Sequence, residues 1–289
     1  MKEKFALIDE GTAHALLERV RYMSAEHRGI DRQAYLLDDF AVLSTNRLKL
    51  RNVDVRDDDL HYLDDLIERL SELWKNGVNV VPILGYCYDP DSEDGEGFLF
   101  MQRARGSELY DDAIICKYEM WTQNKENVYL ESNADAAEYI VRRTYEISQI
   151  PQEHFNKFIS DIMAILNNDI LIDFQGKSNF FYDEKTGFQF IDLDSHTDNY
   201  YGLTDELVSV EAWTSIGGFV PCHFGSDTKV FAPMALVPES IQIIGEKGLE
   251  QLANDNLRIF DKCLSALREN DIPEEVIQKT VGIIKVFGQ

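Results

Sequence analysis

The sequence predicts an α+β protein in which a sheet-rich first part, residues 1–105, precedes a mainly helical second part, residues 106–289. Three patterns support this prediction. Two short apolar runs meet across Asp38-Asp39, which is typical of a β-hairpin. Apolar residues recur at helical spacing between Leu60 and Trp74. Beyond residue 132 the helical period dominates, and one further hairpin is embedded in it.

In the first part we expect a helix over residues 11–27, because Leu16, Leu17, Val20 and Met23 recur at helical spacing. Paired strands over residues 33–37 and 40–43 should follow. A helix from Asp58 should end at Asn76-Gly77, a pair that favours helix termination. Strands over residues 78–86 and 98–101 complete a mostly antiparallel sheet.

In the second part the periodicity predicts helices over residues 134–150 and 152–167. Strands over residues 180–182 and 188–191 should form a hairpin, because the intervening Asp-Glu-Lys-Thr-Gly sequence strongly favours a turn. Residues 197–237 are rich in Gly and Pro, and we expect them to be irregular. Helices over residues 249–270 and 273–286 should follow.

Composition indicates a folded protein. Of the 289 residues, 44% are apolar, which excludes an intrinsically disordered chain because enough surface can be buried to offset the ordering entropy. The four cysteines are scattered without a C-x-x-C pair, so we expect buried thiols in a reducing compartment. The chain has no apolar run of about 20 residues and no N-terminal signal pattern. We therefore expect a cytoplasmic protein.

The net charge restricts the partners that the protein can bind. With 28 Lys+Arg against 52 Asp+Glu, the chain carries a formal charge of -24. This excess repels phosphate backbones and anionic lipid, so we expect no nucleic-acid and no membrane partner. It is compatible with a basic protein partner. A phosphate ligand would need a divalent metal or a locally organised site.

Three oxygen-bearing side chains flank the embedded hairpin: Asp173, Asn179 and Asp192. Carboxylate and amide oxygens at one edge of a hairpin are the ligands that Mg²⁺ prefers, and through Mg²⁺ they can hold phosphate. Plainer structural roles are open for each residue. Asp192 can be an acidic strand end, Asn179 a turn cap, and Asp173 a cap of backbone N–H groups.

From Gly29 to Asp194 the order of elements and this motif resemble the protein-kinase-like fold, including its aminoglycoside-phosphotransferase branch. The resemblance implies a small, mainly antiparallel β lobe followed by a larger helical lobe. It also implies that Asp173 is the catalytic base and that Asn179 and Asp192 bind metal. Lys177 falls in the catalytic loop, where relatives place a cation that faces the transferred phosphate.

The resemblance extends to the first part of the chain. Residues 98–106 look like the hinge strand that joins the lobes, where relatives hold adenine through backbone groups. This similarity implies that Gln102, Arg103 and Ala104 border the nucleotide. Gly29 looks like the remnant of a glycine-rich loop that covers the phosphates.

Other positions depart from the family pattern. Glu68 looks like the helix αC glutamate that pairs with a strand lysine, but Ser44 stands where the pattern Val-Ala-Ile-Lys has that lysine. A serine hydroxyl neither neutralises phosphate nor pairs with Glu68, so the alternative is that Arg47 or Lys49 supplies the charge on a longer strand. Leu171-Ile172 replaces the His-Arg that precedes the catalytic aspartate in protein kinases.

These residues lead to a first hypothesis about function: phosphoryl transfer from ATP with Mg²⁺ to a hydroxyl of a small molecule or a protein. A second hypothesis is a pseudokinase, in which the same fold serves as a nucleotide-binding or protein-binding regulatory module. A third class also stays open, namely an unrelated α+β protein whose hairpin imitates the motif.

Overall fold

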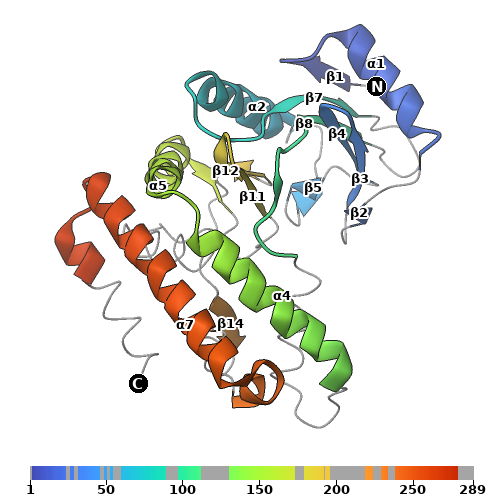
Figure 1. Ribbon diagram of the computed structural model, residues 1–289. Coiled ribbons are helices and arrows are strands. Elements are labelled where there is room, and N and C mark those ends of the chain that lie inside the picture. Colours follow the sequence, from blue (N-terminus) through green and yellow to red (C-terminus); the bar gives the residue numbers. More distant parts are fainter. Residues whose placement is uncertain are drawn as a thin grey trace. The chain divides into compact units, whose positions relative to one another are not determined.

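The computed structural model describes residues 2–23, 27–28, 32–45, 49–50, 53–54, 60–88, 97–111, 130–172, 179–191, 193–195, 219–223, 229–233 and 238–278. The chain divides into two compact units. Unit 1 comprises residues 1–105, 164–172 and 189–197, and unit 2 comprises residues 106–163, 173–188 and 198–289. The fold is α+β, with a small antiparallel sheet and a helical region, as the sequence predicts (Figure 1).

The sheet of unit 1 has six strands in the order β1-β7-β8-β4-β3-β2, and each strand is antiparallel to its neighbours. Leu37 pairs with Phe40 across Asp38-Asp39, which confirms the predicted hairpin. A separate short ribbon pairs β5 with β6. The strands are β1 (Lys2–Phe5), β2 (His27–Arg28), β3 (Arg32–Leu37), β4 (Phe40–Thr45), β5 (Lys49–Leu50), β6 (Val53–Asp54), β7 (Ile83–Tyr88) and β8 (Gly97–Gln102).

Two helices accompany the sheet, α1 (Glu10–Val20) and α2 (Leu60–Lys75). Asp9 caps α1 by accepting a hydrogen bond from the backbone N–H of Thr12. Helix α1 is shorter than the predicted 11–27, because residues after Val20 leave the helix in a turn that begins at Arg21. Helix α2 ends at the predicted place, with Gly77 in the left-handed conformation (φ 83°) that glycine tolerates best.

The sheet separates two faces because side chains alternate along each strand. The hydrophobic core around α1 contains Val42, Cys87 and Phe100, together with Ala13 and Leu16 of α1. We call this side the α1 face. The residues next to these core residues along each strand, such as Tyr86 beside Cys87, therefore lie on the opposite face. The Tyr86 hydroxyl donates a hydrogen bond to Asp64 of α2 (3.1 Å), so we call that side the α2 face.

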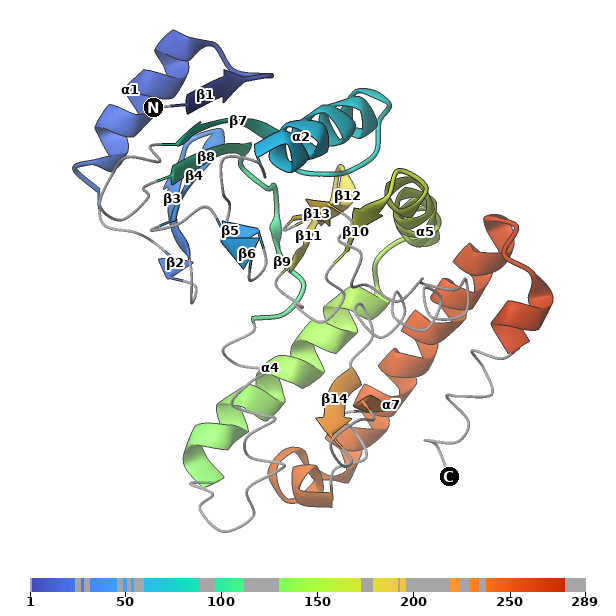
Figure 2. The same ribbon diagram turned by 180° about the vertical axis from the view of Figure 1, so that it is seen from behind.

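Unit 2 is built mainly from three long helices, and both views show α4 and α7 side by side (Figures 1 and 2). Gly245 interrupts α7 with φ 69°, so this element is two helices across a kink. The helices are α4 (Leu130–Ser148), α5 (Gln152–Leu166, whose last turn belongs to unit 1) and α7 (Pro238–Glu269). No helix among the described residues is long and apolar enough to cross a bilayer.

The predicted second hairpin is also confirmed. Strands β11 (Phe180–Asp183) and β12 (Gly187–Phe190) form it, and β9 (Ser107–Glu108) adds a third strand beside β11. Aromatic rings anchor the hairpin to α5: the ring centroids of Phe158 and Phe188 are 4.8 Å apart, and those of Phe158 and Phe180 are 5.9 Å apart.

The prediction of irregular structure throughout residues 197–237 was wrong. Strands β14 (Phe219–His223) and β15 (Lys229–Pro233) pair in register over five positions, from Phe219 with Pro233 to His223 with Lys229. Proline within a run suggests an interrupted strand. In an antiparallel pair only alternate residues point their N–H toward the partner strand, and the pairs that contain Pro233 and Pro221 are two positions apart. Both prolines can therefore occupy the set of positions that donates no ladder bond.

Candidate functional site

A short antiparallel pair lies at the centre of the candidate site. Strand β10 (Ile170–Leu171) pairs with β13 (Asp194–Ser195), with Leu171 opposite Asp194. The flanking residues Ile172 and Leu193 are buried. The pairing brings the chain that leads into Asp173 beside the chain that leaves Asp192. Asp173 and Asp192 themselves lie outside the described residues, as do Lys177 and Gly29.

The segment that precedes Asp192 is also held in unit 1. The backbone N–H of Phe190 donates to the Asn79 carbonyl (3.0 Å), and the N–H of Val81 donates to the Phe190 carbonyl (2.9 Å). Val80 and Phe190 form a parallel bridge. Described residues on both sides of Asp192 are therefore fixed by backbone hydrogen bonds.

Asn179 directly precedes β11 in unit 2 and is 9% exposed. The next residue, Phe180, accepts a hydrogen bond at its carbonyl from the Leu109 N–H (2.8 Å), which fixes the start of the strand. The amide oxygen of Asn179 is a hard donor of the kind that Mg²⁺ prefers.

The hinge-like segment after β8 is tied to unit 1 by three backbone donors. The Gln102 N–H donates to the Pro82 carbonyl (3.2 Å), and the Arg103 N–H donates to the Asp39 carbonyl (2.9 Å). The Arg105 N–H donates to Oε1 of Gln189 (2.8 Å), a residue of β12. None of these three bonds uses the N–H of Ala104, which is half-buried between the tethered residues.

Glu68 lies on α2 and accepts a hydrogen bond from Nζ of Lys4 (2.9 Å). Lys4 is opposite Tyr86 in the β1–β7 register, and both contact Asp64. Burial alone would lower the Lys4 pKa, but the hydrogen bond to Glu68 and the charges of Asp64 and Glu68 outweigh it, so this pKa lies above its usual value. Burial, and then the charge of Asp64, raises the pKa of Tyr86.

Ser44 lies on the other side of the same sheet. In the β4–β8 register it is opposite Phe98, and it is two positions from Val42 along β4, so it shares the α1 face with Val42. The structure therefore brings Glu68 together with Lys4 and does not bring it together with Ser44. Sequence reasoning missed Lys4, because Phe5 is the only apolar residue of β1 and the strand was not predicted.

Helix α2 also contacts the chain that leads into β10. Nη1 of Arg69 donates to the carbonyls of Asn168 (2.9 Å) and Asp169 (3.2 Å), which form the turn between α5 and β10. Asp169 has φ 52°, a left-handed conformation that aspartate tolerates better than most residues. Arg69 thus joins the helix that carries Glu68 to the strand that precedes Asp173.

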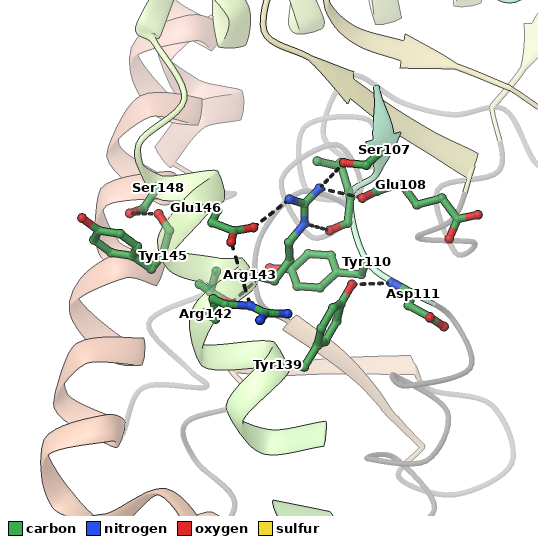
Figure 3. A network of polar contacts seen from close by, with 12 residues as sticks. Ser107, Glu108, Tyr110, Asp111, Tyr139, Arg142, Arg143, Tyr145, Glu146 and Ser148 are labelled. Atoms are coloured by element: carbon green, nitrogen blue, oxygen red, sulfur yellow. Dashed lines mark hydrogen bonds and ion pairs between the residues drawn. The ribbon is translucent and has the colours of Figure 1, made fainter. Parts of the chain in front are cut away.

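Within unit 2, Arg143 of α4 fixes the segment that follows the hinge (Figure 3). Its guanidinium donates to the carbonyls of Leu109 (2.5 Å) and Glu108 (2.6 Å) and to Oγ of Ser107 (3.2 Å). It also forms an ion pair with Glu146. A planar fork of N–H donors can satisfy several acceptors at once, so one side chain fixes β9 and the residues after it against α4.

Comparison with known proteins gives no match to a family model and none to a curated protein. Among solved structures, the chain is similar to WaaP in complex with acyl carrier protein (10% identity, TM-score 0.39), covering 98% of this chain and 99% of that one. It is similar to the Toxoplasma gondii specific rhoptry antigen kinase domain (8% identity, TM-score 0.39), with 81% of each chain covered.

A third similar structure is WbdD with the kinase inhibitor LY294002, at 10% identity and a TM-score of 0.31. The match covers 67% of this chain but only 37% of the WbdD chain. At such identities and TM-scores these similarities assign no family, and the function is inferred from the residues of the chain itself.

Proposed function

We propose that the chain is a divergent kinase-like phosphotransferase that transfers a phosphoryl group from ATP, with Mg²⁺, to a hydroxyl of a small molecule or a protein. In this proposal residues 1–105 form the nucleotide-binding lobe, and residues 106–289 form the lobe that carries most of the catalytic loop. One observation carries the proposal. Strands β10 and β13 are antiparallel, with Leu171 opposite Asp194. Asp173 follows Leu171 by two positions and Asp192 precedes Asp194 by two positions, so the two aspartates adjoin the same end of this strand pair in the sequence.

The proposed roles follow from the chemistry of the side chains. Asn179 and Asp192 hold Mg²⁺, which supplies charge neutralisation at the phosphates. Asp173 accepts the proton of the acceptor hydroxyl, and Lys177 contacts the transferred phosphate. Ala104 is the hinge residue proposed to meet adenine, since the backbone N–H groups of Gln102, Arg103 and Arg105 already donate within the protein.

A second candidate function is an inactive nucleotide-binding or protein-binding module, and the placement of Ser44 favours it. Ser44 lies on the α1 face, whereas the cation that contacts Glu68 is Lys4 of β1. A site without a strand lysine beside the phosphates has lost a charge whose removal costs a large share of transition-state stabilisation. The acidic chain would suit a basic protein partner in this role.

Nucleotide binding is tested by thermal unfolding of the full chain with ATP plus Mg²⁺ and with ATP plus a chelator. We expect a higher melting temperature only when the metal is present. Asp192→Asn should abolish this difference, and the matched control Glu184→Gln, an exposed carboxylate in the turn of the β11–β12 hairpin, should retain it. An unchanged melting temperature of the wild-type chain under both conditions would rule out the nucleotide site.

Turnover separates the two candidates. The phosphotransferase proposal expects ATP consumption that falls about 10²–10⁴-fold in Asp173→Asn, the usual contribution of a positioned general base. The binding-module proposal expects that the wild-type chain and Asp173→Asn both bind ATP in a metal-dependent way and that neither consumes it.

A further inference from the structure

Three side chains with different donor atoms converge in unit 1, and none of them belongs to the proposed phosphotransferase site. They are Glu3 of β1, His14 of α1 and Cys87 of β7. Glu3 and Cys87 are direct partners in the β1–β7 register, so their side chains share the α1 face of the sheet. His14 reaches the same place from α1, which both views show beside β1 (Figures 1 and 2).

Two of the three donor–donor distances match the edges of a tetrahedral metal site, and the third is at most 4.8 Å. Nε2 of His14 lies 3.3 Å from Oε1 of Glu3, and Sγ of Cys87 lies 3.8 Å from the same oxygen. All three donor atoms lie within 4.8 Å of one another. Tetrahedral Zn²⁺ with N and O at about 2.0–2.2 Å and S at about 2.3 Å has donor atoms roughly 3.3–3.8 Å apart.

The surroundings hold the donors in place and leave a route for an ion. The His14 ring packs edge-to-face against Phe5, with the ring centroids 6.1 Å apart. The side chains of His14 and Glu3 are 47% and 28% exposed, whereas Cys87 is 2% exposed. An ion can therefore arrive from solvent past His14 and Glu3 and meet the sulfur beneath them.

We propose that Glu3, His14 and Cys87 form a Zn²⁺ site that joins β1, α1 and β7. A thiolate with an imidazole favours a borderline or soft ion over Mg²⁺ or Ca²⁺, which bind oxygen. Three protein donors leave the fourth tetrahedral position to water. Binding displaces the thiol proton of Cys87, since the thiolate is the ligand. The ion would link β1 and α1 to β7 of the sheet, whether or not a nucleotide is bound.

The metal itself is the probe. Titration of the metal-free full chain with Co²⁺ should give one equivalent of a complex that has tetrahedral visible bands and a thiolate-to-metal charge-transfer band, and Zn²⁺ should displace it. Cys87→Ser should lose the charge-transfer band. His14→Gln should weaken Zn²⁺ binding by at least about a hundredfold, since changes of outer-shell partners alone cost about 10–100-fold.

Cys263→Ser is the matched control, because Cys263 is also a buried free cysteine but belongs to α7. It should retain both the band and the affinity. His14 is half exposed, so His14→Gln tests the site even if Cys87→Ser does not fold. The proposal is overturned if the wild-type chain binds no Zn²⁺. It is equally overturned if the band survives in Cys87→Ser but is lost when Cys222, which is adjacent to His223 in the sequence, is replaced by serine.

Discussion

Nζ of Lys4 on β1 lies 2.9 Å from Oε1 of Glu68 on α2, so a cation of the edge strand takes the position beside the helix glutamate. The contact is partly open to solvent, since the side chain of Lys4 is 26% exposed and that of Glu68 is 71% exposed. Exposed ion pairs contribute about 0.2–1 kcal/mol. We therefore expect a double-mutant cycle with Lys4→Met and Glu68→Gln to give a coupling free energy in that range.

The same pair predicts a dependence on alkaline pH. Because the Lys4 pKa is raised in the folded protein, its contribution to stability is fully present below the ordinary lysine pKa of about 10.4. It is lost as pH rises through the higher folded value. The difference in urea midpoint between the wild-type chain and Lys4→Met should therefore shrink above about pH 10.4. A difference that stays constant up to pH 12 would contradict this expectation.

Gly106, the first residue of unit 2, should not tolerate a side chain. It has φ 78°, and a Cβ atom there would lie 1.9 Å from the Tyr182 carbonyl oxygen. Gly77→Ala is the matched control, because Gly77 has φ 83° with nothing within 4 Å of its Cβ position. Gly77→Ala should cost about 1–2 kcal/mol, the usual penalty of a left-handed residue. Urea denaturation should show a clearly larger loss for Gly106→Ala, and equal losses would refute the close approach.

Arg143 and its neighbour Arg142 offer a comparison on a single helix. The side chain of Arg143 is 16% exposed and donates to two carbonyls and a hydroxyl, whereas Arg142 is 69% exposed. Arg143→Lys keeps the charge but loses the planar fork, and each lost charged hydrogen bond costs about 1.5–3 kcal/mol. Arg142→Lys should change the free energy of unfolding by less than about 0.5 kcal/mol. Similar losses in both variants would show that Arg143 does not hold the segment.

The cap of α1 should weaken in acid. The hydroxyl of Thr12, together with its backbone N–H, donates to Asp9 and holds the pKa of that carboxylate below its usual value. The contribution of a carboxylate with a lowered pKa is present above the ordinary value of about 3.9 and is lost as pH falls through the folded value. Asp9→Ala should therefore melt at a lower temperature than the wild-type chain at pH 7, and the difference should shrink near pH 2, where only the neutral carboxyl is left to accept the Thr12 N–H. A difference of the same size at both pH values would mean that the carboxylate charge does not matter.

Regular elements with dense local signals were predictable from the sequence. The hairpin of β3 and β4 has apolar strands and a two-residue turn, and α2 has a continuous apolar stripe with Gly77 at its end. Strand β1 was missed because three of its four residues are charged. It is a strand through pairing with β7, which lies far away in sequence. The local sequence pattern around β1 does not reveal a strand partner that is so far away in sequence.

The candidate site was predictable to a different degree. The sequence placed Asn179 at the start of a hairpin strand, and the structure describes it there. It also aligned Ser44 with a lysine facing Glu68, but alternation along β4 turns Ser44 to the α1 face, a relation set by the sheet register. The roles of Asp173, Lys177, Gly29 and Asp192 stay predictions, because these residues lie outside the described part of the chain.

The pairing of β1 with β7 has a consequence for how the chain folds. Glu3 and its partner Cys87 are 84 positions apart, whereas the β3–β4 hairpin closes over two residues. Closing a long loop costs entropy before any contact is gained, so non-local strand pairs form slowly. During synthesis from the N-terminus, the first strand must wait unpaired until β7 has left the ribosome. Strand β1 precedes β3 and β4 in the chain, but it can therefore join the sheet only after the β3–β4 hairpin has had time to close.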